Sequence, residues 1–408
     1  MNKTVKVLFL TLIISVLTFA QVFVIGGCGN RKIKTGEIGV VKDEEFNNVY
    51  IELTIDEFNA LGFAFGDSVD ISFDNGKSFK DVPYYSGYYV PVGELLCCGY
   101  PGYPHVVIAR NYGKSTWEEF EMSENSKVEI TLNQKGKYIE TQELYNLHYE
   151  DEKREGESDE MFANFRAVCG GDLAENYFYR SASPCDNQHN RAAYANDLAS
   201  DYGIGFVLNL SDSETKYAAH KSKDDFNSEY YDGLVQEDKV RLLALNANYR
   251  PEDSNLSLTG SRGLFADKFS GELYDANAFV NKLSRAFYEM TTQDGKILIH
   301  CVEGKDRTGF ACALLLALAD ATADEIIDDY MITYYNYYGI TKESMPKKYE
   351  AILGNVYDFF YCTCDADKGT PVNTLNLKQG AENYLKKGGL SDAQIEEIET
   401  YITAKPNA

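Results

Sequence analysis

The chain has 408 residues, of which 44% are apolar, and its formal net charge is −24. This length allows two domains or one large domain, and the apolar content allows a sizeable core. The negative charge argues against a nucleic-acid partner, because phosphate backbones are bound by stripes of Lys and Arg. An anionic substrate would therefore have to be bound by one local basic pocket.

The N-terminus has the features of a secretory signal. Residues 1–6 carry two lysines, and an apolar stretch follows that ends in VIGGC at Cys28. This order is typical of a signal peptide, although the apolar stretch is also long enough for a membrane anchor. Because VIGGC resembles a bacterial lipobox, we expect a signal peptide at residues 1–27 and a lipid on Cys28. The resemblance implies a membrane-anchored bacterial lipoprotein outside the cytoplasm.

Cysteine and histidine usage indicates neither a disulfide framework nor a metal site. The nine cysteines include the neighbours Cys97 and Cys98 and follow no regular spacing. Disulfides are common outside the cytoplasm, so the pairing of these thiols stays open. The five histidines are scattered, and none is combined with cysteines at zinc-site spacing. We therefore expect no metal and no cofactor.

The first part of the mature chain is predicted to be a polar tether at residues 28–48 and a small β-rich domain at residues 49–147. Alternating runs such as VYIELTI and SVDISF indicate strands, and DNG at 74–76 indicates a hairpin turn. The pattern allows a barrel or a sandwich, and it faintly resembles the small β-barrel domain of SAM hydroxide adenosyltransferases. The many tyrosines could pack the core or line a ligand groove.

The second part of the chain has a different character. Residues 148–160, HYEDEKREGESDE, are charged and lack periodicity, which predicts a solvated acidic linker or a surface loop. Over residues 161–408, strand-like runs such as IGFVLNLS, VRLLALN and KILIHC alternate with helical runs. This alternation predicts an α/β fold, with a parallel or mixed sheet flanked by helices, preceded by the small all-β domain.

The motif with the clearest chemistry is the loop HCVEGKDRTG at residues 300–309, between an apolar strand and an apolar helix. A loop at the carboxyl edge of a parallel sheet, followed by a helix N-terminus, binds anions through its amides. The same positive field favours the thiolate of Cys301. Arg307 offers a planar fork of donors for phosphate oxygens, and Gly304 allows a tight bend. Thr308 can donate a hydrogen bond to the sulfur.

His-Cys-x-x-Gly-x-x-Arg-Thr resembles the active-site loop of cysteine-dependent protein tyrosine phosphatases. The fuller HC-x-x-GKDRTG is similar to a bacterial branch of tyrosine and dual-specificity phosphatases that also act on phosphoinositides. The resemblance runs from about Asn164 to the C-terminus and includes NFRAVCGG and NYFYRSASP. The chain departs from the branch at Ala167, Asn209 and Ser211, where the branch has Asp, Asp and Arg.

The resemblance implies a role for each residue of the loop. Cys301 would be the nucleophile that forms a phosphocysteine intermediate, and Arg307 would bind the phosphate. His300 would orient the backbone of Cys301. Backbone amides would also bind the phosphate, and they belong to Val302, Glu303, Gly304, Lys305 and Asp306.

The general acid is the open question at this site. Typical tyrosine phosphatases use an Asp in a WPD loop, and this chain has no such tripeptide. Asn246 and Asn248 occupy the equivalent strand end and cannot act as acids, while Asp253 lies further along. Asp306 lies within the phosphate loop and can reach a leaving oxygen. We favour Asp306 over Asp253, with loop scaffolding as the alternative role for Asp306.

The charges of the loop bear on the substrate. Glu303 disfavours highly anionic substrates by repulsion at short range, whereas Lys305 favours them. The first choice is therefore a phosphorylated peptide or protein or a small phosphate ester, and the alternative is a phosphoinositide or inositol phosphate. A sulfur transferase and a non-catalytic phosphate-binding surface protein are the competing classes.

Overall fold

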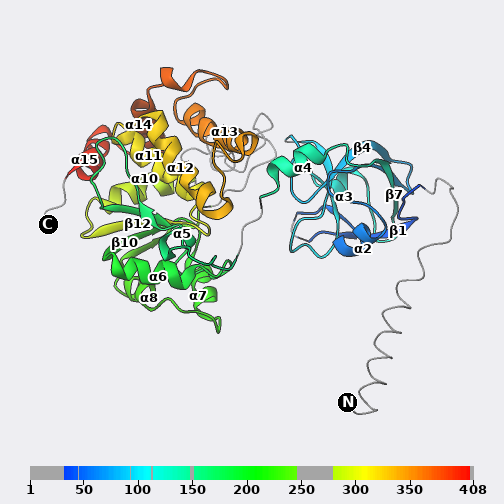
Figure 1. Cartoon of the computed structure of the whole chain (residues 1–408), viewed down its shortest axis with the longest axis horizontal. Coiled ribbons are helices and arrows are strands. Elements are labelled where there is room, and N and C mark those ends of the chain that lie inside the picture. The colour runs from blue at the N-terminus through cyan, green and yellow to red at the C-terminus, as the bar shows by residue number, and fades with distance from the viewer. Residues whose placement is uncertain are drawn as a thin grey trace, which may run out of the picture.

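The computed structural model describes residues 32–44, 46–91, 93–111, 114–147, 151–245 and 279–404, which form two lobes (Figure 1). The predicted signal peptide and Cys28 lie outside the described residues. Within the described ranges, no helix is both long enough and apolar enough to cross a bilayer.

The N-terminal lobe is a closed β-barrel, which decides between the two architectures that the sequence allowed. Around the barrel the strands follow the order β1-β2-β6-β5-β4-β3-β7, and all neighbours are antiparallel except β4 and β5. Side chains alternate between the core and the outside, so that Val69, Ile71 and Phe73 are all buried. The strands are β1 (Ile38–Lys42), β2 (Val49–Ile51), β3 (Ser68–Phe73), β4 (Ser78–Tyr85), β5 (Leu95–Cys98), β6 (Val107–Arg110) and β7 (Lys127–Gln134).

Two expectations for this lobe need correction. The predicted tether contains β1, which closes the barrel by pairing with β7, so the domain begins before residue 49. The lobe is also not all-β, because it contains α2 (Ile55–Ala60), α3 (Thr116–Glu119) and α4 (Ile139–Tyr145). Helix α2 begins with a capping box between Thr54 and Glu57, a short-range signal that alternation of apolar residues does not reveal.

The charged segment is a surface loop of the C-terminal lobe, which is one of the two structures expected for it. Residues 151–160 are exposed or partly exposed, and some of them contact the lobe. Asp151 lies 2.9 Å from Nδ1 of His189, and Nη2 of Arg154 donates to the carbonyl of Asn336 at 2.9 Å. Helix α5 (Asp159–Phe162) begins inside this segment. Its charges are therefore used in specific contacts.

The C-terminal lobe contains a five-stranded mixed sheet with the order β11-β10-β12-β9-β8. The first four strands are parallel, and β8 pairs antiparallel with β9. Ile297 and Ile299 of β12 face one core, whereas Leu298 faces the other, so both sides of the sheet are covered. This arrangement agrees with the predicted α/β class. The strands are β8 (Arg166–Ala167), β9 (Phe178–Ser181), β10 (Ile204–Asn209), β11 (Val240–Leu242) and β12 (Lys296–His300).

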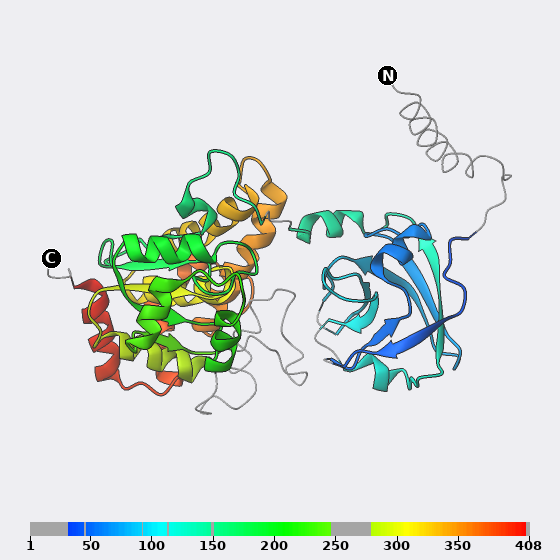
Figure 2. The same cartoon turned by 90° about the horizontal axis from the view of Figure 1, so that it is seen from below.

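Helices cover the two faces of the sheet as separate groups (Figures 1 and 2). Helices α6, α7 and α8 lie on one face, and α10 to α12 with α14 and α15 lie on the other. The bounds are α6 (Ala192–Asp201), α7 (Glu214–Lys221), α8 (Glu229–Gln236), α10 (Phe279–Met290), α11 (Asp306–Leu318), α12 (Ala323–Tyr338), α13 (Pro346–Thr363), η2 (Val372–Thr374), α14 (Leu377–Lys387) and α15 (Asp392–Thr403).

Candidate active site

The predicted loop connects β12 to α11 at the carboxyl edge of the sheet. His300 ends β12 and pairs with Asn209 of β10 on one side and Ser181 of β9 on the other. Cys301 follows directly and is 4% exposed. Helix α11 begins at Asp306 and is apolar around its circumference, so its N-terminus is fixed at the loop by burial in the core.

Gly304 meets a strict steric requirement. Its φ is +66°, and a Cβ at this position would lie 2.1 Å from the carbonyl oxygen of Ser181. A residue with a side chain would therefore be strained in its backbone and would also collide with β9. This contact fixes the loop close to the neighbouring strand.

Two loop carbonyls are held away from the centre of the loop by other parts of the chain. The amide of Ser183 donates to the carbonyl of Val302 at 2.9 Å. The hydroxyl of Tyr337 donates to the carbonyl of Glu303 at 2.7 Å. In a trans peptide the carbonyl and the next amide point in opposite directions. The amides of Glu303 and Gly304 are therefore directed to the inner side of the loop.

The carbonyl of Gly304 is held by two more donors. Nη2 of Arg180 lies 2.8 Å from this oxygen, and Nδ2 of Asn164 lies 3.3 Å from it. Arg180 is fully buried and pairs through Nη1 with the carboxylate of Asp329 on α12. By the same peptide geometry, these contacts direct the amide of Lys305 inward. The loop thus presents successive amides to one anion.

Arg307 and Thr308 complete the loop at the first turn of α11. Nη1 of Arg307 donates to the carbonyl of Leu245 at 3.1 Å, which positions the guanidinium across the carboxyl edge of the sheet. The hydroxyl oxygen of Thr308 is buried and has no hydrogen-bond partner among the described residues. A buried hydroxyl without a partner is costly, so a ligand or thiolate at this position would satisfy it.

His300 is placed to orient Cys301. Its Nδ1 lies 3.0 Å from the carbonyl oxygen of Cys301, and its ring packs edge-on against Tyr231. Burial lowers the pKa of His300 to about 4, and the contact with the Cys301 backbone opposes this shift only in part. The imidazole is therefore neutral at neutral pH and does not serve as a proton donor.

Charged side chains form a compact group on the outer part of the loop. Nζ of Lys305 lies 2.6 Å from Oε2 of Glu303 and 3.9 Å from Oδ2 of Asp306. Desolvation raises the pKa of Asp306, with Glu303 adding to the rise and Lys305 and Arg307 opposing it. The raised pKa favours the protonated acid, which is the form that a proton donor needs. The Asp306 side chain is 44% exposed, so solvent screens part of this shift, whose direction is toward the protonated acid.

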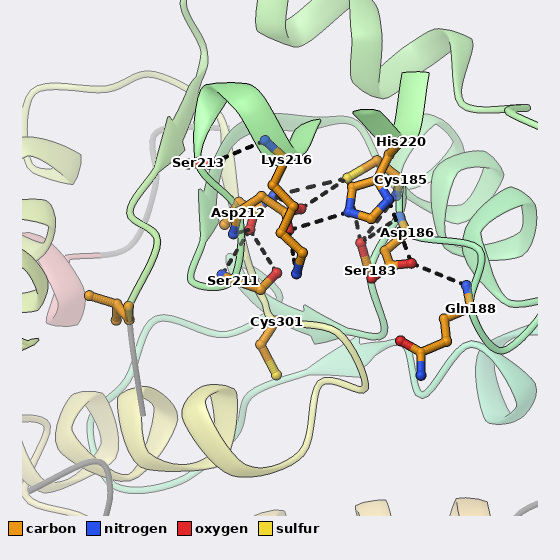
Figure 3. A network of polar contacts seen from close by, with 12 residues as sticks. Ser183, Cys185, Asp186, Gln188, Ser211, Asp212, Ser213, Lys216, His220 and Cys301 are labelled. Atoms are coloured by element: carbon orange, nitrogen blue, oxygen red, sulfur yellow. Dashed lines mark hydrogen bonds and ion pairs between the residues drawn. The ribbon is translucent and has the colours of Figure 1, made fainter. Parts of the chain in front are cut away.

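A second acidic residue, Asp212, lies close to the loop but has a different character (Figure 3). Burial alone would raise its pKa, yet the hydrogen bond from Asn209 and the charge of Lys216 hold the pKa below its usual value. Asp212 therefore stays ionised. The sulfur of Cys301 points away from it. Asp212 is thus unsuited to donate a proton to a leaving group.

The comparison with protein families decides the classification. A model described as "Tyrosine phosphatase family" matches residues 160–404, which is more than half of the chain. The chain belongs to the tyrosine phosphatase family. The match includes the loop from Cys301 to Thr308 and excludes the barrel.

Two curated relatives carry names from the same family. A tyrosine-protein phosphatase of Nostoc commune is 33% identical over 118 residues, which cover 27% of this chain and 40% of that protein. A protein of Cupriavidus necator, also named as a tyrosine-protein phosphatase, is 41% identical over 66 residues. That segment covers 16% of this chain and 24% of the relative. The chain thus spans less than half the length of each of these relatives.

A solved structure shares a shorter likeness. The crystal structure of an uncharacterized conserved protein from Thermotoga maritima is 26% identical and covers 23% of this chain and 35% of its own. The TM-score is 0.21. The overlap is too small to support an argument about fold or function.

The phosphatase loop brings together most of the residues that the sequence singled out. Cys301, Arg307 and Asp306 lie on one loop and helix start, together with the predicted phosphate-binding residues Val302, Glu303, Gly304, Lys305 and Thr308. Asp253, the other candidate acid, lies outside the described residues, as do Asn246 and Asn248.

The residues that hold the loop from outside have no role that the sequence alone predicts. Asn164 and Arg180 lie inside the motifs NFRAVCGG and NYFYRSASP, which resemble motifs of the bacterial phosphatase branch. The resemblance therefore pointed to these two residues but did not indicate what they do. Tyr337 lies in a tyrosine-rich helix and has no local signal. In the described part of the chain, no three acidic, Cys or His side chains are arranged to hold a metal ion, and the eight described cysteines form no disulfide with one another.

Proposed function

We propose that the protein is a phosphatase that hydrolyses phosphate monoesters of phosphorylated peptides or proteins through a phosphocysteine intermediate at Cys301. The observation that carries this proposal is the loop geometry. The carbonyls of Val302, Glu303 and Gly304 are held outward, so the following amides face one anion beside the sulfur. Amides, Arg307 and a helix N-terminus together stabilise the negative charge of a phosphoryl transition state.

The first chemical step is attack by the Cys301 thiolate on phosphorus. A sulfur–phosphorus bond forms while the bond from phosphorus to the ester oxygen breaks. Asp306 gives its proton to the departing oxygen, which leaves as an alcohol or phenol. Arg307 and the loop amides bind the non-bridging oxygens throughout.

The second step is hydrolysis of the phosphocysteine. A water molecule attacks phosphorus and transfers a proton to the carboxylate of Asp306, which restores the acid. The sulfur–phosphorus bond breaks, and inorganic phosphate leaves. We assign stabilisation of the departing thiolate to the hydroxyl of Thr308, which is buried and makes no hydrogen bond to Cys301 or to any other described residue in the resting site.

The location of the enzyme is a further part of the proposal. A signal peptide at residues 1–27 and a lipid on Cys28 would anchor it at the membrane face outside the cytoplasm. Its partners there would be phosphorylated proteins, peptides or small phosphate esters, without nucleic acid. The net charge of −24 supports the last point.

A substrate panel tests the function. The full chain would be assayed for phosphate release from p-nitrophenyl phosphate, phosphotyrosine and phosphoserine peptides, and an inositol phosphate. We expect the phosphopeptides and p-nitrophenyl phosphate to be the preferred substrates. Preference for the inositol phosphate would favour the alternative substrate class. Binding of inorganic phosphate without any turnover would favour a non-catalytic phosphate-binding protein.

A further inference from the structure

We propose that Glu303 restricts the site to substrates with a single phosphate group by neutralising Lys305, the second cation of the loop. This inference rests on the proposed phosphatase function and names the substrate class of that same site. It makes Glu303 a specificity-determining residue in addition to a source of a backbone amide.

The contact between the two side chains is short and partly shielded. Nζ of Lys305 lies 2.6 Å from Oε2 of Glu303, and the side chains are 15% and 22% exposed. Water and salt screen such a pair less than a pair on the open surface. Although burial alone would lower the pKa of Lys305, Glu303 is the main cause that raises it well above the usual range. Lys305 is therefore a charged partner of Glu303.

Helix α12 fixes the pair in place. The hydroxyl of Tyr337 binds the backbone carbonyl of Glu303 at 2.7 Å, and Nζ of Lys305 lies 3.5 Å from the hydroxyl of Tyr338. Glu303 is thus held at its backbone by Tyr337 and at its carboxylate by Lys305. Neither side chain can turn toward a ligand without breaking one of these contacts.

The charges of the loop then favour one phosphate. Glu303 and Lys305 cancel, so that, with Asp306 protonated, Arg307 is the cation of residues 302–308 that no carboxylate of this stretch compensates. The guanidinium fork of Arg307 suits a single phosphate. A second phosphate on the same substrate would find no further uncompensated cation in this stretch, because the charge of Lys305 is already neutralised by the carboxylate of Glu303. With an amide in place of that carboxylate, Lys305 would be available to bind the second phosphate.

Equilibrium binding separates this effect from catalysis. All measurements use the full chain with Cys301→Ser, so that turnover does not consume the ligand. Calorimetry compares inorganic phosphate with inositol trisphosphate, without and with Glu303→Gln. We expect Glu303→Gln to raise the ratio of the affinity for inositol trisphosphate to the affinity for phosphate by about tenfold. This is the size of the effect of one additional unit charge, here that of Lys305, acting on a phosphate at short range.

Two controls identify the cause. Adding Lys305→Met to Glu303→Gln should return the affinity ratio to that of the parent, because the gain depends on the freed ammonium. Asp328→Asn makes the same carboxylate-to-amide change at an exposed position of α12 and should leave the ratio unchanged. A gain that persists without Lys305 would overturn the proposed pairing mechanism.

The outcomes distinguish this inference from the proposed function. If phosphate binds and the ratio does not move with Glu303→Gln, Glu303 does not determine specificity, and the phosphatase proposal stands. If neither ligand binds to any form of the chain, the phosphate loop itself is misassigned, and both proposals fail.

Discussion

Nη2 of Arg180 donates a hydrogen bond of 2.8 Å to the carbonyl oxygen of Gly304, although the two residues are separated by 124 positions in the chain. The guanidinium is fully buried, and its Nη1 pairs with the carboxylate of Asp329 of α12. The shape of the phosphate loop is therefore determined by β9 and α12 as well as by its own sequence. These contacts of Arg180 therefore help to fix the direction of the loop amides.

The steric constraint on Gly304 gives the first prediction. Gly304→Ala places a Cβ 2.1 Å from the carbonyl oxygen of Ser181 at a φ of +66°. We expect a loss of roughly 2–4 kcal/mol in the free energy of unfolding and a loss of most activity. Denaturant unfolding and p-nitrophenyl phosphate hydrolysis measure the two effects.

Gly354 provides the matched control for this prediction. It lies in the interior of α13, and a Cβ there would meet nothing within 4 Å. Gly354→Ala should leave activity unchanged and stabilise the protein by roughly 0.5–1 kcal/mol, because Ala favours the helix. Equal stability effects at both positions would show that the close approach to Ser181 is not what requires glycine at 304.

The extent to which the sequence predicted this site follows from the range of its contacts. The strand, loop and helix around Cys301 are encoded within about twenty consecutive residues, by an apolar run, a loop with Gly304 and a buried helix. The hydrogen bonds from Arg180 and from Tyr337 to carbonyls of the loop depend on how β9 and α12 pack against it. The periodicity of apolar residues does not specify these contacts. The sequence therefore indicated the candidate reactive groups on the loop and did not indicate the side chains that hold the loop in place.

The start of the barrel was also mispredicted, because it depends on a contact between residues far apart in the sequence. The segment at residues 38–42 is predicted to be part of the polar tether, because five residues give too short an alternation of apolar and polar positions to indicate a strand. Its pairing with β7, 85 or more positions later, is what makes it part of the barrel. Helix α13 was not predicted either, although Pro346 at its start is a typical first-turn residue.

The identity of the general acid gives the second prediction. Asp306→Asn should reduce turnover of an alkyl phosphate by about 10²–10⁴ and reduce turnover of p-nitrophenyl phosphate far less, because nitrophenolate leaves without a proton. In the unaltered protein, turnover of the alkyl ester should fall as the pH rises through the raised pKa of Asp306, since the acid must be protonated. Steady-state kinetics with both substrates over a pH series measure both effects.

Asp253→Asn is the control for this assignment. If Asp253 is the donor, the selective loss on the alkyl phosphate appears in that variant, and Asp306→Asn impairs both substrates alike. Equal losses for both substrates in both variants would rule out both carboxylates. Efficient turnover would then be confined to good leaving groups such as aryl phosphates.

The buried imidazole of His300 gives the third prediction. Its pKa falls from about 6.5 in the unfolded chain to about 4 in the folded protein. The unfolded chain therefore binds the proton more readily, and His300 causes a loss of stability as the pH falls from 6.5 toward 4. The full effect is about 3 kcal/mol. In His300→Gln the free energy of unfolding should depend less steeply on pH over this interval.

A direct titration keeps this prediction testable if His300→Gln folds poorly. The imidazole resonances of His300 can be followed by NMR in the unaltered protein over a pH series. A midpoint for His300 at or above 6.5 would contradict the neutral buried imidazole.

Anchoring gives the fourth prediction. If Cys28 carries a lipid, Cys28→Ala should block lipid attachment and give a form that is unprocessed or released from the membrane. Membrane fractionation and metabolic labelling with a fatty acid measure the change. Cys169→Ala, which removes an exposed cysteine of the C-terminal lobe, serves as the control. Identical fractionation and migration of Cys28→Ala and the parent would refute the lipobox interpretation.

The central claim is that Cys301 is the nucleophile, and the most direct test compares the full chain with its Cys301→Ser variant. Both are assayed on p-nitrophenyl phosphate, and thermal unfolding of both is recorded. We expect turnover to be abolished while the unfolding temperature is retained, because a serine hydroxyl is a much weaker acid than a thiol, stays protonated and does not attack phosphorus. Unchanged turnover in a folded Cys301→Ser protein would contradict the phosphocysteine mechanism.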